Sequence, residues 1–251
     1  MRLRYLRKGD GGKTIVFLCG LGDNLTSWVS QIDAFSPTDT VIALDNRGAG
    51  ESETPSDPYT VSRMAEDAHD LVGYLGCGPV TAIGVSMGGA ICQEWALRYP
   101  QDIDRLVLSS TWAAPDVYLD TLYMHWQNLA KSGNRKALIE SLLLYCWSPG
   151  YLSAHPEVIP EFIDGETMNL DGFILAAGAC RAHDCLDRLG GIDRETLVLI
   201  GAQDILIRPE LTHALADLLP RVQVKIMQTG HMPYWEQPDT FAALVRDFLA
   251  S

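Results

Sequence analysis

Short, continuous apolar runs recur along the chain and alternate with longer segments of helical periodicity. The runs are rich in β-branched residues and lack polar alternation, which is typical of strands covered on both faces of a parallel sheet. The last run, residues 222–227, alternates apolar and polar positions, as expected of an edge strand. The predicted strands are residues 14–19, 40–44, 80–85, 105–108, 196–200 and 222–227.

The segments between these runs carry apolar residues at the spacing of an amphipathic helix. In residues 61–75 the apolar positions include Met64, Ala68 and Leu71, and Gly76 follows as a helix stop. Strands that alternate with helices in this way predict an α/β fold with a doubly wound, mostly parallel sheet. Further helices are predicted over residues 87–99, 210–219 and 240–249.

Residues 113–186 interrupt the alternation, because they contain helix-forming sequence and no convincing strand. We therefore expect a core formed by residues 1–112 and 187–251, with residues 113–186 inserted as a helical cap. The aromatic side chains of this region either pack its own core or line an apolar cavity beneath it. The candidate substrate-binding residues are Trp112, Trp126 and Trp147.

Composition and charge argue against several other classes of protein. The chain has 251 residues, 47% hydrophobic and 20% charged, which suits a globular domain that needs no disulfide. A net charge of −13 disfavours nucleic acids and anionic membranes as partners. The basic residues Arg2, Arg4, Arg7 and Lys8 form no larger patch, and we expect them to lie on a solvated edge strand.

The six cysteines show no CxxC pair and no zinc-ligand spacing, which is typical of free thiols in a reducing compartment. The sequence has no run of 18 apolar residues, and residues 1–12 contain no apolar signal segment. We therefore expect a cytoplasmic protein without metal or organic cofactor. The sequence does not indicate its oligomeric state.

The strongest chemical signal is Gly84-Val85-Ser86-Met87-Gly88, between a predicted strand and a predicted helix. In that context G-x-S-x-G is typical of a nucleophile elbow, a sharp turn that projects a serine hydroxyl above the sheet. The glycines are needed because a Cβ there would collide with the neighbouring strand and helix. Since the helix N-terminus also favours negative charge, Ser86 is the predicted nucleophile.

A serine nucleophile needs a base, and His231 is the one histidine of six in a loop directly after a predicted strand. Open α/β sheets assemble their sites at this carboxyl edge. Asp204 follows residues 196–200 at the same edge and would orient the imidazole, which gives the order Ser86, Asp204, His231. Asp116 also follows a strand and remains an alternative acid.

Acyl transfer also requires donors for the negative charge that develops on the carbonyl oxygen. One predicted donor is the backbone amide of Met87, directly after the nucleophile. The second is the amide of Leu21, in the loop Cys19-Gly20-Leu21-Gly22, and its side chain would face the substrate. The alternative is a plain glycine turn.

Together these motifs identify a family. The chain resembles the α/β-hydrolase superfamily through the CGLG loop, the stretch DNRGAGES at residues 45–52, the elbow GVSMGG, the turn GAQD and the segment GHMPYWEQPDTF. Small members such as 3-oxoadipate enol-lactonases and carboxylesterases are similar, and the resemblance implies a helical cap. Cys19 and Ala49 stand where the family commonly has histidine. At position 19 two outcomes are open. Either the backbone donor is unaffected by the replacement, or the thiol of Cys19 near the site modifies the site or is itself oxidised.

We expect the partner to be a small-molecule acyl substrate, an ester, thioester or lactone that the protein hydrolyses. Ser86 attacks, His231 transfers the proton and water releases the acyl group from the acyl-enzyme. Ser86 excludes the aspartate-based chemistry of haloalkane dehalogenases and epoxide hydrolases. A lyase on the same triad would place a charged residue near Ser86, and Lys131 and Arg181 are candidates. A small-molecule receptor with slow turnover is the third possibility.

Overall fold

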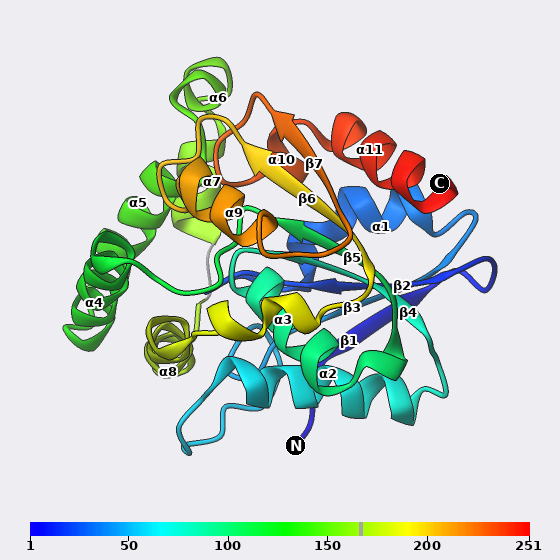
Figure 1. Ribbon diagram of the computed structural model, residues 1–251. Coiled ribbons are helices and arrows are strands. Elements are labelled where there is room, and N and C mark those ends of the chain that lie inside the picture. The colour runs from blue at the N-terminus through cyan, green and yellow to red at the C-terminus, as the bar shows by residue number, and fades with distance from the viewer. Residues whose placement is uncertain (166–167) are drawn as a thin grey trace.

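The computed structural model describes residues 1–165 and 168–251, and within these ranges the chain forms a seven-stranded sheet between helices (Figure 1). The strands are β1 (Tyr5–Lys8), β2 (Thr14–Leu18), β3 (Thr40–Leu44), β4 (Val80–Val85), β5 (Ile103–Ser109), β6 (Glu195–Gly201) and β7 (Val222–Met227). Their order across the sheet is β1-β3-β2-β4-β5-β6-β7. Only the pair β1 and β3 is antiparallel in this part of the chain. The predicted α/β fold with a doubly wound, mostly parallel sheet is confirmed.

The helices divide between the two faces of the sheet (Figure 1). One face is covered by α1 (Val29–Phe35) and α11 (Pro238–Ala250). The other is covered by α2 (Val61–Tyr74), α3 (Met87–Arg98) and α9 (Pro209–Ala216). The remaining helices are α4 (Val117–Lys131), α5 (Arg135–Cys146), α6 (Pro149–Ala154), α7 (Val158–Gly165), α8 (Leu170–Ala182), α10 (Pro233–Glu236) and the 3₁₀ helices η1 (Leu25–Trp28), η2 (Pro100–Asp102) and η3 (Leu186–Gly191).

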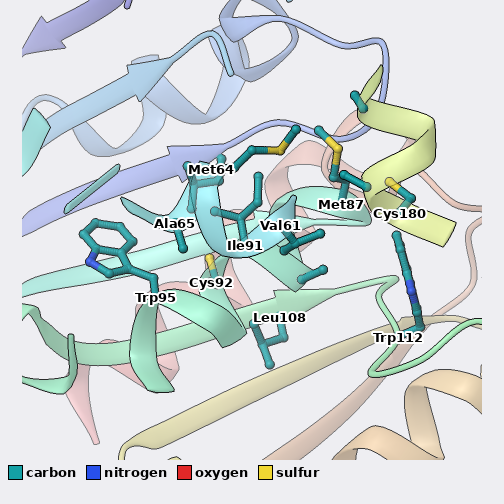
Figure 2. Packing of buried hydrophobic residues seen from close by; sticks show 14 of the residues in the cluster. Val61, Met64, Ala65, Met87, Ile91, Cys92, Trp95, Leu108, Trp112 and Cys180 are labelled. Carbon is teal, nitrogen blue, oxygen red and sulfur yellow. The ribbon is translucent and has the colours of Figure 1, made fainter. Parts of the chain in front are cut away.

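The central strands are buried on both faces, which explains their continuous apolar sequences. In β2, Ile15 and Phe17 pack into the cluster that includes α1 and α11. Val16 and Leu18 pack into the opposite cluster, which includes α2 and α3. All four side chains are 0% exposed. Figure 2 shows part of the second cluster, where side chains of α2 and α3 face one another above the sheet.

The two edge strands agree with the sequence pattern. β1 is one edge, and its Arg7 and Lys8 are exposed, as expected for the basic N-terminal residues. β7 is the other edge, with four successive exposed residues, 223–226. The predicted bounds of β3, β4 and β7 match the structure, and those of β2, β5 and β6 differ by one or two residues at their ends. At the end of α2, Gly76 adopts a φ of 62°, so it stops the helix as predicted.

Between β5 and β6 the described residues form the helices α4 to α8 and no strand. These helices gather on one side of the molecule, at the left in Figure 1, with α4 packed against α8. They occupy the segment for which the sequence predicts a helical cap; residues 166–167 of that segment lie outside the described residues. Throughout the described part of the chain, no helix combines the length and the hydropathy needed to span a membrane.

His183 lies where this helical segment returns to the core. It follows α8 directly and is 5% exposed, and its Nε2 lies 3.5 Å from Sγ of Cys185. Its ring meets the ring of Trp112 edge-on. Burial lowers the pKa of His183 to about 4, because the charged imidazolium loses its hydration. The folded state therefore binds this proton less readily than the unfolded chain.

We expect acid to destabilise the protein through His183. The ordinary pKa of its ring is 6.5 and the folded value is about 4. The neutral ring's stabilising contribution is therefore complete above pH 6.5 and is lost as the pH falls from 6.5 toward 4. The loss amounts to about 2 kcal/mol at pH 5. In urea unfolding, His183→Gln should show a shallower fall in the free energy of unfolding between pH 7 and pH 5. The exposed His213→Gln is the control, and equal slopes for wild type and His183→Gln would contradict this account.

Candidate active site

Ser86 occupies the turn between β4 and α3, with backbone φ 55° and ψ −122°. A non-glycine residue at positive φ is strained and persists only where its surroundings fix it. A Cβ on Gly84 would lie 2.2 Å from the carbonyl oxygen of Gly88, and one on Gly88 would lie 2.1 Å from that of Leu18. Close packing therefore requires both glycines of the G-x-S-x-G sequence, as predicted.

Hydrogen bonds from the neighbouring strand hold this turn. The amide of Ser86 donates to the carbonyl of Ser109 at 3.0 Å. The carbonyl of Ser86 accepts from the hydroxyl of Thr111 at 2.7 Å and from the amide of Ala90 at 3.1 Å. Since both main-chain polar groups of Ser86 are engaged, its side chain is the part of the residue left to act on a ligand.

His231 and Asp204 are brought together at the same edge of the sheet. Nδ1 of His231 lies 2.8 Å from Oδ2 of Asp204, whose side chain is 0% exposed. The other carboxylate oxygen accepts from the amides of Leu206 and Ile207, each at 2.9 Å. A carboxylate accepts only, so the neutral imidazole carries its proton on Nδ1. Nε2 is then the nitrogen available to a group in the adjoining pocket.

Asp116, the alternative acid, is placed elsewhere. It caps the N-terminus of α4, where Oδ1 accepts from the amide of Leu119 at 2.8 Å. Its Oδ2 forms an ion pair with Arg208, and the side chain is 37% exposed. The structure therefore pairs His231 with Asp204 and gives Asp116 a capping role.

Ser86 and His231 line one pocket, which lies between the sheet edge and the helical segment. Most of its wall is apolar and aromatic. Among the predicted binding residues, Leu21, Trp126 and Trp147 line this pocket. Phe162, which sequence reasoning did not single out, packs against Trp147 with ring centres 4.8 Å apart.

Trp112 is not brought to this pocket, so its predicted place at the substrate is corrected. The side chain is 0% exposed and packs against the ring of Tyr123 at 5.6 Å. Figure 2 shows it in the core cluster with Met87 and Cys180. The sequence placed Trp112 just before the helical segment, but the chain passes through the core at that point.

The two predicted oxyanion donors lie on either side of Ser86 in the fold. Met87 is the first residue of α3, and Leu21 follows β2 in the loop against the pocket. Across residues 1–165 and 168–251, neither amide has a protein acceptor. Gly20 lies next to the turn, where a Cβ on it would be in ordinary van der Waals contact with Cβ of Ser86, at 3.5 Å. Neither amide is therefore committed to an acceptor in the described chain.

Cys19 is buried beneath the loop and does not line the pocket. Its Sγ donates to the carbonyl of Leu44 at 3.6 Å. Burial raises the pKa of its thiol well above the ordinary range, and the carboxylates of Asp23 and Asp45 add to the effect. A protonated, inaccessible thiol is poorly suited to oxidation. This arrangement favours the alternative in which the replacement leaves the backbone donor unaffected.

The charged candidates for a lyase are not in the pocket. Lys131 ends α4, and Arg181 forms an ion pair with Asp120, with N···O distances of 2.7 and 3.1 Å. Neither lines the pocket with Ser86. Within the described ranges, no group of three or more His, Cys, Asp or Glu residues is arranged to hold a metal ion.

Comparison with known proteins agrees with this geometry. The profile of the alpha/beta hydrolase fold matches residues 13–238, most of the chain. The chain belongs to the α/β-hydrolase family. It is 25% identical over 241 residues to 3-oxoadipate enol-lactonase 2 of Acinetobacter baylyi, covering 95% of this chain and 90% of that protein. It is 28% identical over 242 residues to a putative carbamate hydrolase, RutD, of Agrobacterium fabrum, covering 94% and 92%.

Solved structures resemble this α/β hydrolase over nearly the whole length of its chain. The enol-lactonase from Burkholderia xenovorans LB400 superposes with a TM-score of 0.94 at 26% identity, covering 99% of this chain and 96% of that one. A thermophilic esterase from Thermogutta terrifontis gives a TM-score of 0.91 at 27% identity, covering 99% and 93%. The family and these relatives place the chain among hydrolytic enzymes.

Three residues of this α/β hydrolase that were not among the predicted site residues surround the candidate site. Tyr123 and Asp23 line the pocket, and Glu236 supports the loop of His231. The hydroxyl of Tyr123 is buried and has no hydrogen-bond partner in the described part of the chain. Asp23 directly follows the glycine loop, and this position was the one feature of the sequence that indicated a place near the site. Nothing in the sequence indicates the contacts of Glu236.

Glu236 joins the histidine loop to the helical segment. Its Oε1 accepts from the amides of Ser148 at 2.9 Å and Gly230 at 3.0 Å, and its Oε2 accepts from the hydroxyl of Ser148 at 2.7 Å. In the same contact, the amide of His231 donates to the carbonyl of Cys146 at 2.9 Å. One carboxylate thus binds the chain on both sides of the pocket.

Removal of this carboxylate should loosen the contact. Glu236→Ala leaves the two amides and the hydroxyl of Ser148 without their acceptor, so the free energy of unfolding should fall by about 2 kcal/mol. Glu236→Gln keeps an acceptor at the same position and should lose less. The measurement is urea unfolding at pH 7.5, with the exposed Glu210→Ala as the control. If Glu236→Ala costs no more than Glu210→Ala, the contact contributes nothing to stability.

Proposed function

We propose that this protein is a serine hydrolase that cleaves an ester, thioester or lactone of a small acyl substrate through an acyl-enzyme intermediate. The observation that carries the proposal is the geometry around Ser86. It stands on a strained turn in the wall of the pocket that also contains His231. The imidazole of His231 is oriented by the buried carboxylate of Asp204.

In the proposed reaction, Oγ of Ser86 attacks the carbonyl carbon while Nε2 of His231 accepts the hydroxyl proton. Asp204 stabilises the resulting imidazolium without taking the proton itself. The amides of Leu21 and Met87 donate to the oxyanion, and an apolar wall strengthens these interactions by excluding water. His231 then protonates the leaving oxygen or sulfur, and a water activated by His231 releases the acyl group from Ser86.

The names of the relatives support this reaction class, because they include enol-lactonases and an esterase. Carbamates are a second candidate, since several relatives are named as putative carbamate hydrolases. Attack on a carbamate carbonyl would use the same nucleophile and base. A panel of esters, thioesters, lactones and carbamates would rank these substrates, and an absence of turnover on all four would favour a receptor.

Replacement of the proposed nucleophile should remove nearly all activity while the fold persists. Ser86→Ala keeps the small side chain but has no hydroxyl, so kcat on phenyl esters should fall at least about 10³-fold. A fluorophosphonate probe should label the wild type once and should not label Ser86→Ala, as read by intact-protein mass spectrometry. Labelling of a different serine, or retained turnover in a folded variant, would refute the assignment.

The two candidate acids make opposite predictions. Asp204→Asn should keep the geometry but favour the wrong tautomer of His231, lowering kcat by about 10⁴-fold, as in serine proteases. Asp116→Asn removes a helix cap and an exposed ion pair, so kcat should change less than about threefold while stability falls slightly. Steady-state kinetics of both variants on one ester decide the matter. A larger loss of kcat in Asp116→Asn would reverse the assignment.

A further inference from the structure

The pocket around Ser86 contains a carboxylate, and its described lining residues include no lysine and no arginine. Among the described residues that line it, Asp23 is the one acidic group, and neither lysine nor arginine contributes. Among the described lining residues, an anionic substrate group would therefore meet no lysine or arginine as a countercharge.

Asp23 is held at the pocket wall by neutral donors. Its Oδ1 accepts from the amide of Asn24 at 2.8 Å, and its Oδ2 accepts from the hydroxyl of Tyr234 at 3.1 Å. It forms no ion pair within the described chain. Burial raises the pKa of Asp23 to about 6, so the carboxyl is still ionised at pH 8. The negative charge on the pocket wall thus has no cation beside it.

The size of the electrostatic effect is large enough to determine selectivity. Two like charges about 6 Å apart, at an effective dielectric constant of about 20, weaken binding by roughly a hundredfold. The net charge of −13 acts in the same direction at longer range. Aromatic residues make up much of the remaining wall and give no compensating charge.

We propose that this pocket accepts neutral and cationic acyl substrates and rejects those that carry a carboxylate, with Asp23 as the discriminating residue. This inference rests on the proposed serine hydrolase function and specifies its substrate class. Asp23 follows the loop that contains Leu21, so its charge lies on the segment predicted to hold the carbonyl oxygen. Selectivity would thus come from the same loop that stabilises the oxyanion.

The test uses three phenyl esters of one chain length that end in a carboxamide, a carboxylate or an ammonium group. Phenol release is measured by chromatography at pH 8, and kcat/KM is compared within each variant. For wild type, the carboxamide ester should exceed the carboxylate ester at least about thirtyfold, and the ammonium ester should equal or exceed the carboxamide ester. In Asp23→Asn, the carboxamide-to-carboxylate ratio should fall about tenfold.

The matched control is Asp33→Asn, which removes the same charge from an exposed position on α1, where Asp33 pairs with Lys8. Its ratios should equal those of wild type. Asp23→Ser repeats the test if Asp23→Asn does not fold. If wild type hydrolyses the carboxylate ester within threefold of the carboxamide ester, the inference is wrong. It is also wrong if discrimination is unchanged in the Asp23 variants or if Asp33→Asn changes it equally.

Failure of the proposed function would look different. In that case the neutral carboxamide ester itself would not be hydrolysed by wild type, or its hydrolysis would persist in Ser86→Ala. Ester turnover that depends on Ser86 but ignores the terminal charge would overturn only the role of Asp23. The two proposals are therefore separated by the neutral ester alone.

Discussion

The packing of α3 against β2 and β4 is the constraint on which the candidate site depends. Gly84 and Gly88 approach one another and the end of β2 so closely that neither position admits a Cβ. This contact forces the chain to turn sharply at Ser86, where it adopts a positive φ. The residues around this turn are almost completely buried. Their packing offsets the conformational free energy that the strained backbone of Ser86 costs. A looser contact would let the serine relax to an ordinary helical conformation and turn its hydroxyl away.

Convergence of the other groups follows from the direction of the strands. β2, β4, β6 and β7 run parallel, so the residues that follow them meet at one edge although they are distant in sequence. Asp23, Ser86, Asp204 and His231 each come from one of these four connections. A change in one connection at this edge can therefore alter the charge of the pocket without altering the nucleophile. Asp23 is an example, because its carboxylate is negative where an anionic ligand would need a positive charge.

The sequence was sufficient for the features that depend on local pattern. Continuous apolar runs identified the buried strands, and G-x-S-x-G identified the turn. Each pattern lies within a few consecutive residues, although the contact that requires it, such as that of Gly88 with Leu18, is long-range. The pairing of His231 with Asp204 was predictable from their positions after strands. The placement of Trp112 was not, because whether a tryptophan faces a cavity or the core depends on how α4 and α8 pack. The contacts of Glu236 were also hidden, since they join residues 88 positions apart, at Ser148 and Glu236.

The shared carboxylate of Glu236 has a consequence for motion. Because Ser148, Gly230 and His231 are joined by one small set of hydrogen bonds, we expect the helices α5 and α6 and the histidine loop to open as a single cooperative unit. Their amide protons should then exchange with solvent water at similar rates, set by one opening equilibrium. If a ligand enters by displacing α5 and α6, these hydrogen bonds would break. The imidazole of His231 would then lose its fixed position for as long as the helices are displaced. In the proposed reaction, an acyl group on Ser86 would therefore meet a correctly positioned base only while these hydrogen bonds are intact.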